Sequence, residues 1–493
     1  MERTPNILFI MADQLRYDSL GCTGHPVVLT PNIDKLASRG ALFRRAFVQA
    51  AVCGPSRASI YTGRYPHSHR SRFNEVPLGL GEKTIADYFN AAGFRSALVG
   101  RTHFMPITAT NGFEPYAYYD GLPAKDPYSP YIQYLQQCGY SDEDISLRYW
   151  PKGLRPELGH EAYPEDFREA YAPSRIAAEH SDTAFLTDQA LRFMREQGDQ
   201  PWMLHVSYWK PHLPFCVSSP YHGMYDPQTV PMPLLQEDEL EHKPPLQKLF
   251  REERRGNFLE DQTLLRQIRA VYFGMITEVD HHIGRLTAEL MRLGLIENTL
   301  IVFTSDHGEY LGDHYMVEKE LFYDQAIHVP LILSLPRVIP SGEVVEELVE
   351  SIDILPTCLE ISNITVPPCI QGRSLLPLFH GVTHDWRQAV FAEWDFQYYH
   401  CREQLGLAPE QCKAIMIRDL EWKYVHYTDQ PCELYRLTED PNEFVNLADH
   451  GDYQGVVQEM RARILNWRMH TEEKEPEIDL TYATYLRNPW EPA

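Results

Sequence analysis

Short apolar runs that end in polar residues recur along the chain. Five such runs lie at residues 6–11, 96–99, 202–208, 300–304 and 329–333. Runs of this length are typical of strands buried on both faces of a parallel sheet. Between the third and fourth, residues 259–293 repeat apolar side chains at every third or fourth position, which predicts a long amphipathic helix. The pattern therefore predicts an α/β domain with a mostly parallel sheet and flanking helices.

A further helix is expected from Cys53 to about Gly63. Pro55 suits its first turn and Gly63 its C-terminal end. Cys53 would then lie at a helix N-terminus, where unpaired N–H groups and the helix dipole favour negative charge, and Arg57 could reach the same place. A cysteine in this position would be an activated thiol or the precursor of a more reactive group. A lone cysteine, by contrast, is more often a buried structural residue.

The composition of the chain changes near residues 372–383. Beyond this stretch, residues 421–427 alternate between apolar and polar side chains, as in a half-exposed strand. We therefore expect a large domain over residues 1–383 and a smaller C-terminal subdomain over residues 384–493. The charged tail that begins near Glu472 is a candidate contact with a second copy of the chain in a homo-oligomer.

Charge and cysteine content exclude several classes of function. The net charge of −24 argues against nucleic acid or an anionic membrane as a partner, so an anionic substrate would need a local group of cations. The nine cysteines are scattered without a Cys-x-x-Cys pair, which argues against a zinc cage or a disulfide framework. The first apolar run is too short for a signal peptide, and none is long enough to span a bilayer. We expect a reduced, cytoplasmic protein.

Polar residues at two strand ends are candidate metal ligands. Asp13 and Gln14 follow the first apolar run, and Asp306 and His307 follow the run at 300–304. Ligands of open α/β sheets collect beyond the carboxyl ends of the strands. An isolated Asp more often caps a turn, but these oxygen donors with one imidazole suit a divalent cation of the calcium or manganese kind better than a structural zinc.

Basic side chains accompany these strand ends. Arg101 and His103 follow the run at 96–99, and His212 follows the strand at 202–208. With Arg57 and Lys319 they could neutralise anionic oxygens and move protons, although a lone histidine is more often structural. The whole set fits hydrolysis of a sulfate or phosphate ester. Residues 104–180 lack strong periodicity and are expected to form an irregular excursion that contacts substrate.

Two motifs connect these candidates to a known family. Cys53-Gly54-Pro55-Ser56-Arg57, followed by Thr-Gly-Arg-Tyr-Pro at 62–66, resembles the signature of the type I sulfatases, in which the cysteine is oxidised to formylglycine. The run Ser-Asp-His-Gly-Glu-x-x-Gly-Asp-His at 305–314 and Lys319 follow in family order, and the likeness extends from residue 5 to about 450. The resemblance implies an alkaline-phosphatase-like α/β fold and a smaller C-terminal α+β subdomain with an antiparallel sheet and a helix.

The same resemblance implies roles for the candidate residues. One divalent cation would be bound by Asp13, Gln14, Asp306, His307 and residue 53, and Ca²⁺ is expected in preference to Mn²⁺. Arg57 would orient the formylglycine hydrate, His103 would be the base for elimination, and His212 with Lys319 would bind the ester and protonate the leaving group. Arg101 stands where sulfatases usually carry Lys. The expected reaction cleaves a sulfate monoester, a small anionic substrate, through a covalent sulfo-enzyme intermediate. A separate maturation enzyme would form the formylglycine.

Several alternatives remain open. The Asp13-Gln14 and Asp306-His307 pairs and Asn74, a candidate substrate-binding residue, are similar to the phosphonate monoester hydrolases, which share this fold and nucleophile. Those hydrolases tend to carry Tyr and Thr in place of Arg101 and His103, so a phosphonate monoester or phosphodiester hydrolase is the second hypothesis. A non-catalytic binding protein and a cysteine hydrolase are remote alternatives, because each leaves part of the catalytic set without a use.

Overall fold

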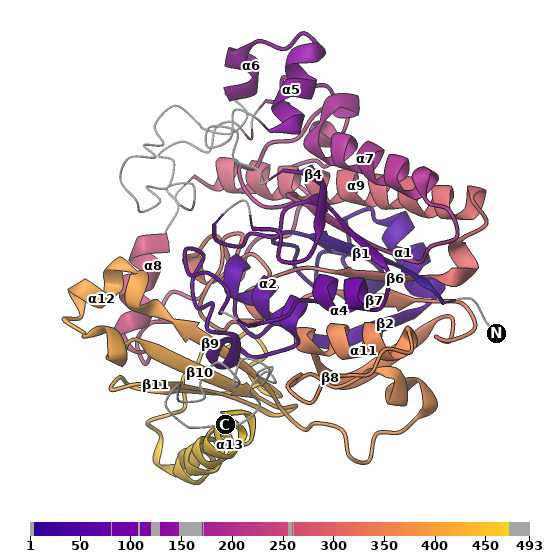
Figure 1. Ribbon diagram of the computed structural model, residues 1–493. Coiled ribbons are helices and arrows are strands. Elements are labelled where there is room, and N and C mark those ends of the chain that lie inside the picture. The colour runs from indigo at the N-terminus through magenta and orange to yellow at the C-terminus, as the bar shows by residue number, and fades with distance from the viewer. Residues whose placement is uncertain are drawn as a thin grey trace, which may run out of the picture.

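A large sheet crosses the middle of the molecule, and a smaller sheet lies to one side of it (Figure 1). The computed structural model describes residues 4–79, 81–106, 109–119, 129–146, 170, 172–254, 259 and 261–472. Within these residues the large sheet has eight strands in the order β4-β3-β5-β1-β6-β7-β2-β8. The strands are β1 (Asn6–Ala12), β2 (Ala41–Phe47), β3 (Arg95–Gly100), β4 (Glu114–Tyr118), β5 (Trp202–Tyr208), β6 (Thr299–Thr304), β7 (Leu331–Ser334) and β8 (Glu343–Glu350).

Most strand pairs of this sheet are parallel. β1 pairs in parallel with β5 and β6, β3 with β4 and β5, and β2 with β8. Only β7 runs antiparallel to its neighbours, β6 and β2. Every residue of β1, β5 and β6 is buried, because helices cover both faces of the sheet. The predicted mostly parallel α/β sheet is confirmed.

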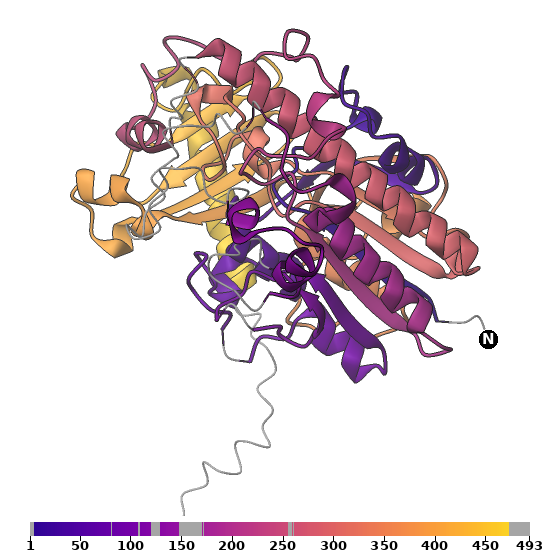
Figure 2. The ribbon, with the colours of Figure 1, turned by 90° about the horizontal axis from the view of Figure 1, so that it is seen from above.

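The alternation of side chains along β1 divides the core into two layers. Leu8 and Ile10 pack with α1 (Pro31–Ser38), α7 (Asp182–Glu196) and α9 (Gln262–Arg292). Ile7 and Phe9 point to the opposite face and pack with α2 (Cys53–Thr62), α4 (Ile85–Ala91) and α11 (Ile354–Ile361). Figures 1 and 2 show α7 and α9 side by side across one face of the sheet.

The other α-helices of the described residues are α3 (Pro66–His69), α5 (Pro130–Gln137), α6 (Asp142–Ser146), α8 (Pro245–Arg254), α10 (Asp324–Ile327), α12 (His400–Gln404) and α13 (Gln454–Glu472).

Two sequence predictions concern the segments on either side of β5. The long helix expected at 259–293 is confirmed as α9, which begins after the N-cap Asp261. The irregular excursion expected at 104–180 is wrong in part, because β4, α5 and α6 lie in it. Their aromatic side chains, such as Tyr131, bury against the core. The segments 120–128 and 147–169 lie outside the described residues.

The smaller sheet is antiparallel, with the order β12-β11-β10-β9. Its strands are β9 (Val390–Asp395), β10 (Lys413–Arg418), β11 (Trp422–Tyr427) and β12 (Glu433–Arg436). Met460 and Ile464 of α13 pack on Tyr424 and Leu434, so the expected antiparallel sheet with a helix is confirmed. The domain boundary at residues 383 and 384 stays a prediction. The tail after Glu472, with its expected contact to a second copy, lies outside the described residues.

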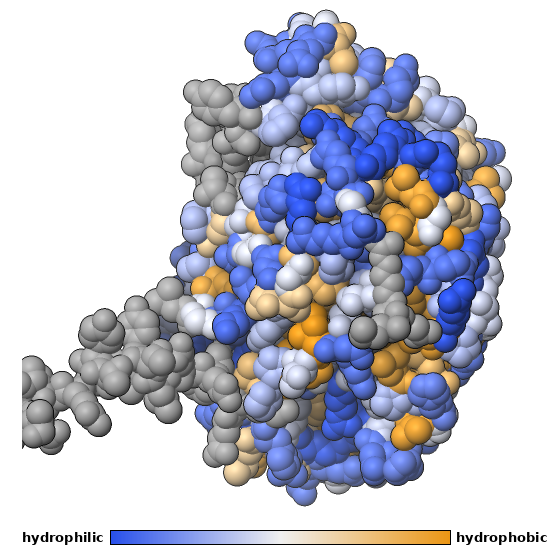
Figure 3. Space-filling view, turned by 45° about the vertical axis from the view of Figure 1, so that its right-hand side comes forward, coloured by the Kyte–Doolittle hydropathy of each residue, from blue (hydrophilic) through white to orange (hydrophobic). Residues whose placement is uncertain are grey.

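The face of the molecule in Figure 3 is mostly hydrophilic, with hydrophobic residues in separate patches. Among the helices that the structure describes, none has both the length and the apolar character needed to cross a membrane. The expected cytoplasmic location stays a prediction.

Candidate active site

Four adjacent strands of the large sheet end at the site. β3, β5, β1 and β6 are neighbours and run parallel, so their carboxyl ends lie along one edge. The segments that leave these ends carry predicted residues: Arg101 and His103 after β3, His212 after β5, Asp13 and Gln14 after β1, and Asp306 and His307 after β6. The edge beyond the carboxyl ends is where ligands of such sheets bind.

The N-terminus of α2 brings Cys53 to the same edge. Cys53 is the first residue of the helix and is 1% exposed, and Val52 before it is extended with φ −140°. The backbone N–H of Gly54 donates to Oδ1 of Asn74 at 2.9 Å, which caps this end. Gly63 ends the helix in the left-handed region with φ 66°, where glycine is favoured. The helix predicted from Pro55 and Gly63 is confirmed, and Asn74 lies against its first turn.

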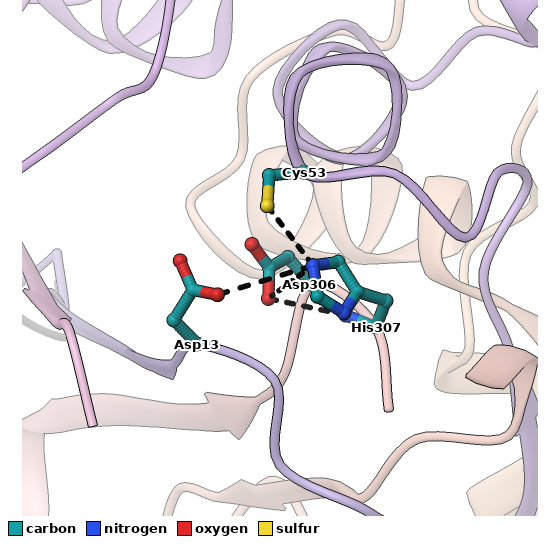
Figure 4. Close-up of side chains that lie close together, drawn as sticks. All are labelled: Asp13, Cys53, Asp306 and His307. Atoms are coloured by element: carbon teal, nitrogen blue, oxygen red, sulfur yellow. Dashed lines mark hydrogen bonds and ion pairs between the residues drawn. The ribbon is translucent and has the colours of Figure 1, made fainter. Parts of the chain in front are cut away.

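Four buried side chains converge into one cluster (Figure 4). One ligand atom from each of Asp13, Cys53, Asp306 and His307 lies within 4.8 Å of the others. The Cys53 Sγ is 3.0 Å from Nε2 of His307, and that nitrogen is 3.9 Å from Oδ1 of both Asp13 and Asp306. Oδ1 of Asp13 is buried and has no hydrogen-bond partner within the described residues. A carboxylate oxygen left in this way fits a site that a divalent cation completes.

Arg57 joins the two carboxylates of the cluster. Its Nε donates to Oδ2 of Asp306 at 2.7 Å, and its Nη2 donates to Oδ2 of Asp13 at 2.8 Å. All three side chains are fully buried. The other terminal nitrogen, Nη1, donates to the Ser207 hydroxyl at 2.8 Å and to the Arg101 carbonyl at 3.0 Å. Arg57 therefore positions both acids, because the separate nitrogens of its planar fork reach both carboxylates in a fixed geometry that the single nitrogen of an ammonium does not offer.

Arg101 adds a second cation next to Cys53. Its guanidinium donates to Oδ2 of Asp13, lies 3.9 Å from the Cys53 Sγ, and stacks over the Trp209 ring with 4.1 Å to the ring centroid. Burial alone would raise the pKa of Asp13, but Arg101 and Arg57 hold it well below its ordinary value. Asp13 is therefore ionised and available as a ligand.

Lys319 connects Gln14 to His212. Its Nζ donates to Oε1 of Gln14 and to Nε2 of His212, each at 3.0 Å. Nδ1 of His212 donates to the Leu213 carbonyl at 2.7 Å, which fits a neutral ring with its proton on Nδ1. Burial opposes the charge on Lys319, but Cys53, Glu318 and Asp13 raise its pKa above the ordinary value, so it stays an ammonium.

Two histidines and the cysteine have shifted pKa values. Burial lowers the pKa of His103 well below its ordinary value, and Arg101 and Arg57 act in the same direction. Burial and Lys319 likewise lower the pKa of His212. Both rings are therefore neutral and can accept a proton. Burial raises the pKa of the Cys53 thiol to about 12. The thiol itself is therefore not activated, and of the two possibilities that its place at a helix N-terminus suggested, the precursor of a more reactive group stays a prediction.

Three contacting residues were not predicted from the sequence. Ser207 is buried at the end of β5 and accepts from Arg57, and Trp209 stacks on Arg101. Neither carries a signal in the sequence beyond its place near a strand end. Glu309 accepts from Nε2 of Gln14. It stands in the same motif as Asp306 and His307, and that position was the available signal.

Two models of known protein families match this chain. The model described as Sulfatase matches residues 5–364. The model described as N-sulphoglucosamine sulphohydrolase, C-terminal, matches residues 312–470.

Known proteins are similar over nearly the whole chain. The multifunctional alkaline phosphatase superfamily protein PehA of Trinickia caryophylli is 34% identical and covers 94% of this chain and 95% of its own. An arylsulfatase of Clostridium perfringens is 28% identical, with 94% of each chain covered. Among solved structures, a phosphonate monoester hydrolase of Silicibacter pomeroyi superimposes with a TM-score of 0.84 at 32% identity, over 95% of this chain and 96% of that one.

Proposed function

The chain belongs to the sulfatase family, and from this premise we propose that it hydrolyses a small sulfate monoester to an alcohol and sulfate, with a nucleophile formed by oxidation of Cys53 to formylglycine. The Cys53 Sγ stands for the oxygen atoms of that modified side chain. As the hydrate, the modified residue supplies one hydroxyl to attack sulfur and a second to expel sulfate. An unmodified thiol lacks the second hydroxyl, and its high pKa makes it a poor nucleophile.

The donor set of the cluster supports one divalent cation. Asp13, Asp306 and His307 with residue 53 would bind it, and Gln14 would add an amide oxygen from the same edge. Ca²⁺ suits this set of mostly oxygen donors best, and Mn²⁺, which also takes carboxylate and carbonyl ligands, is the second candidate. When bound, the cation polarises the ester and lowers the pKa of a coordinated hydroxyl.

The residues around the cluster support separate roles in proton transfer and charge neutralisation. Arg57, Arg101 and Lys319 carry positive charge in a buried site, where charge on an anionic ester is stabilised most strongly. Lys319 holds a proton and contacts the neutral His212, so this pair would protonate the leaving alcohol. His103 is neutral, and its buried Nδ1 has no partner among the residues that the structure describes, so it would serve as the base.

One observation carries the proposal: Cys53 contacts His307 and Arg101 while Asp13 and Asp306 lie within 4.8 Å of its ligand atom. The test produces the protein together with a formylglycine-generating enzyme, measures the mass of the peptide that contains residue 53, and assays an aryl sulfate. We expect the modified mass and turnover. An unmodified thiol with no cleavage of any sulfate ester would refute it.

Substitution of the nucleophile separates an enzyme from a binding protein. Cys53→Ala should abolish turnover, whereas a protein that only binds an anion would retain its affinity for sulfate esters. The matched control is Cys358→Ala, which truncates another buried cysteine, on α11. The control should keep full turnover after correction for folded protein.

A second candidate is hydrolysis of a phosphonate monoester or a phosphodiester. It is favoured by the high similarity to a phosphonate monoester hydrolase structure. The presence of Arg101 and His103 at the site favours the sulfatase instead. Turnover of an aryl sulfate compared with a phenyl phosphonate ester decides between them, and a strong preference for the phosphonate would make the second candidate the main activity.

A further inference from the structure

The side-chain amide of Gln14 is bound from two sides by groups of opposite charge. Its Nε2 donates to Oε2 of Glu309, and its Oε1 accepts from Nζ of Lys319 at 3.0 Å. A carboxylate only accepts hydrogen bonds and an ammonium only donates them. Of the two orientations that an amide can adopt, only one satisfies both neighbours, the one that turns the oxygen away from Glu309.

Glu309 also binds the backbone that leads to Lys319. Its Oε1 accepts from the N–H of Leu311 at 2.8 Å and from the N–H of Glu318 at 2.6 Å. The side chain is fully buried, yet it is not among the residues whose ligand atoms converge in the cluster. One carboxylate therefore contacts both Gln14 and the segment that carries its partner Lys319.

The backbone on both sides of Lys319 is strained. Glu318, Glu320 and Leu321 have φ values of 66°, 72° and 51°. Residues other than glycine adopt this left-handed region only where the surroundings impose it, and such strain gathers at functional sites. Beside the bond to Glu309, the N–H of Glu320 donates to the Ala51 carbonyl at 3.0 Å. These bonds fix where the ammonium of Lys319 lies.

We propose that Glu309 is a positioning residue for the reaction: it orients the Gln14 amide with its oxygen toward the cation site and Lys319, and it fixes the position of Lys319. The inference rests on the proposed function, because it assigns Gln14 and Lys319 the parts given there. Glu309 itself would touch neither the substrate nor the cation.

An exchange of the two residue types tests this inference. In Glu309→Gln, the new amide oxygen must face the two backbone N–H groups, so its NH2 faces the NH2 of Gln14. Whichever way it turns, the Gln14 amide then faces one donor with its own NH2, either the amide at position 309 or Lys319, so its oxygen is no longer held toward the site. In the double variant Gln14→Glu with Glu309→Gln, the carboxylate at position 14 accepts from both the amide at position 309 and Lys319, and an oxygen again faces the site.

The readouts are the affinity for Mn²⁺, measured by titration of metal-free protein, and kcat of the modified enzyme. Glu309→Gln should lose roughly 10- to 100-fold in each, as is usual when the group that orients a metal ligand is changed. The double variant should recover most of both losses. A double variant no better than Glu309→Gln would overturn the inference, and so would a single variant with wild-type affinity and turnover.

The control is Glu433→Gln in β12, the same substitution at a buried carboxylate that accepts from Gln247, Tyr427 and Tyr435. It should lower the melting temperature without changing Mn²⁺ affinity. If Glu309→Gln does not fold, the double variant decides alone. A folded, active double variant supports the inference, and a double variant that also fails to fold overturns it. If the wild type cleaves no ester while the Mn²⁺ affinities follow the expected order, the proposed function fails and the positioning of Gln14 stands.

Discussion

At the scale of single residues, the site depends on side chains that each contact several partners. Arg57 donates to Asp13, to Asp306 and to Ser207 through different nitrogens. The two acids are both fully buried, and without this cation between them their charges would repel each other in a medium of low dielectric. The identity of Arg57 therefore matters for its shape as well as for its charge.

Arg57→Lys should lower both stability and activity. Lysine keeps the charge, but its single nitrogen cannot reach all the acceptors that the three nitrogens of the guanidinium contact. Asp13 keeps its contact with Arg101, so Asp306 is the acid that loses its arginine partner. We expect a loss of about 3 kcal/mol in the free energy of unfolding and a loss of roughly 100-fold in kcat/KM, measured by denaturant titration and aryl sulfate turnover.

The comparison for this prediction is Ser207→Ala, which removes only one acceptor of Arg57 and should cost about 1 kcal/mol. If Arg57→Lys were no more damaging than Ser207→Ala, the bridging role of the guanidinium would be wrong.

At the scale of elements, strand ends and helix starts place the chemistry. The segment after β6 carries Asp306 and His307 and then passes very close to the backbone of α10. At Gly308, a Cβ atom would lie 1.9 Å from the Gln325 carbonyl oxygen. The N–H of Gly308 also donates to the Ala326 carbonyl at 2.8 Å. Glycine at this position is required by the close approach of two backbones.

Gly308→Ala should therefore displace the segment that carries His307. We expect a lower melting temperature and a loss of roughly 10-fold or more in Mn²⁺ affinity, because a metal ligand moves. Calorimetry and metal titration measure the two effects.

Gly198→Ala is the matched control, because no heavy atom of the described residues, apart from its chain neighbours, lies within 4 Å of a Cβ atom at that position. It should leave both quantities near the wild-type values. A Gly308→Ala protein that binds Mn²⁺ as tightly as this control would contradict the role given to the close approach.

At the scale of the whole molecule, the core contains histidines that folding keeps neutral. Burial lowers the pKa of His205 to about 3 and that of His282 to about 3. His205 is a fully buried residue of β5, where its Nδ1 donates to the Phe9 carbonyl and its Nε2 accepts from the Tyr61 hydroxyl. In the unfolded chain these rings titrate near 6.5. The unfolded state therefore binds more protons as the pH falls below 6.5, and acid destabilises the fold.

Above pH 6.5, His205 should add nothing to the pH dependence of the free energy of unfolding. Below pH 6.5, it should make that free energy decrease as the pH falls. Between pH 6.5 and 5, this histidine should contribute a loss of about 2 kcal/mol. His205→Gln, which keeps a donor and an acceptor, should reduce the measured loss by that amount in denaturant titrations.

The exposed His384, with 75% of its side chain accessible, is the control, and His384→Gln should leave the pH dependence unchanged. An unchanged pH dependence in His205→Gln as well would show that the buried ring titrates normally.

Removal of divalent cations should also be visible in global stability. A ligand that binds only the folded state at 100 times its dissociation constant adds about 2.7 kcal/mol. A chelator should therefore lower the melting temperature, and added Mn²⁺ or Ca²⁺ should restore it. A melting temperature that responds to neither would argue against a cation among the buried acids at Asp13 and Asp306.

Much of this molecule follows from local patterns in the sequence. The apolar runs predict the buried parallel strands, because only a sheet covered on both faces buries every side chain of a strand such as β1. Pro55 and Gly63 predict the helix behind Cys53, because their backbone preferences are local. Residues at strand ends, such as Asp13 and Asp306, could be singled out from their order along the chain.

Other features depend on which segments become neighbours. The sequence by itself determined the residue types of the site and their place at strand ends, since these depend on short-range periodicity and motif spacing. Only the tertiary structure decided that β3, β5, β1 and β6 lie side by side, that Glu309 binds Gln14 and the Glu318 backbone, and that burial suppresses the thiolate of Cys53. Strand order, contacts between distant segments and desolvation arise from the packing of the whole chain, and no local pattern encodes them.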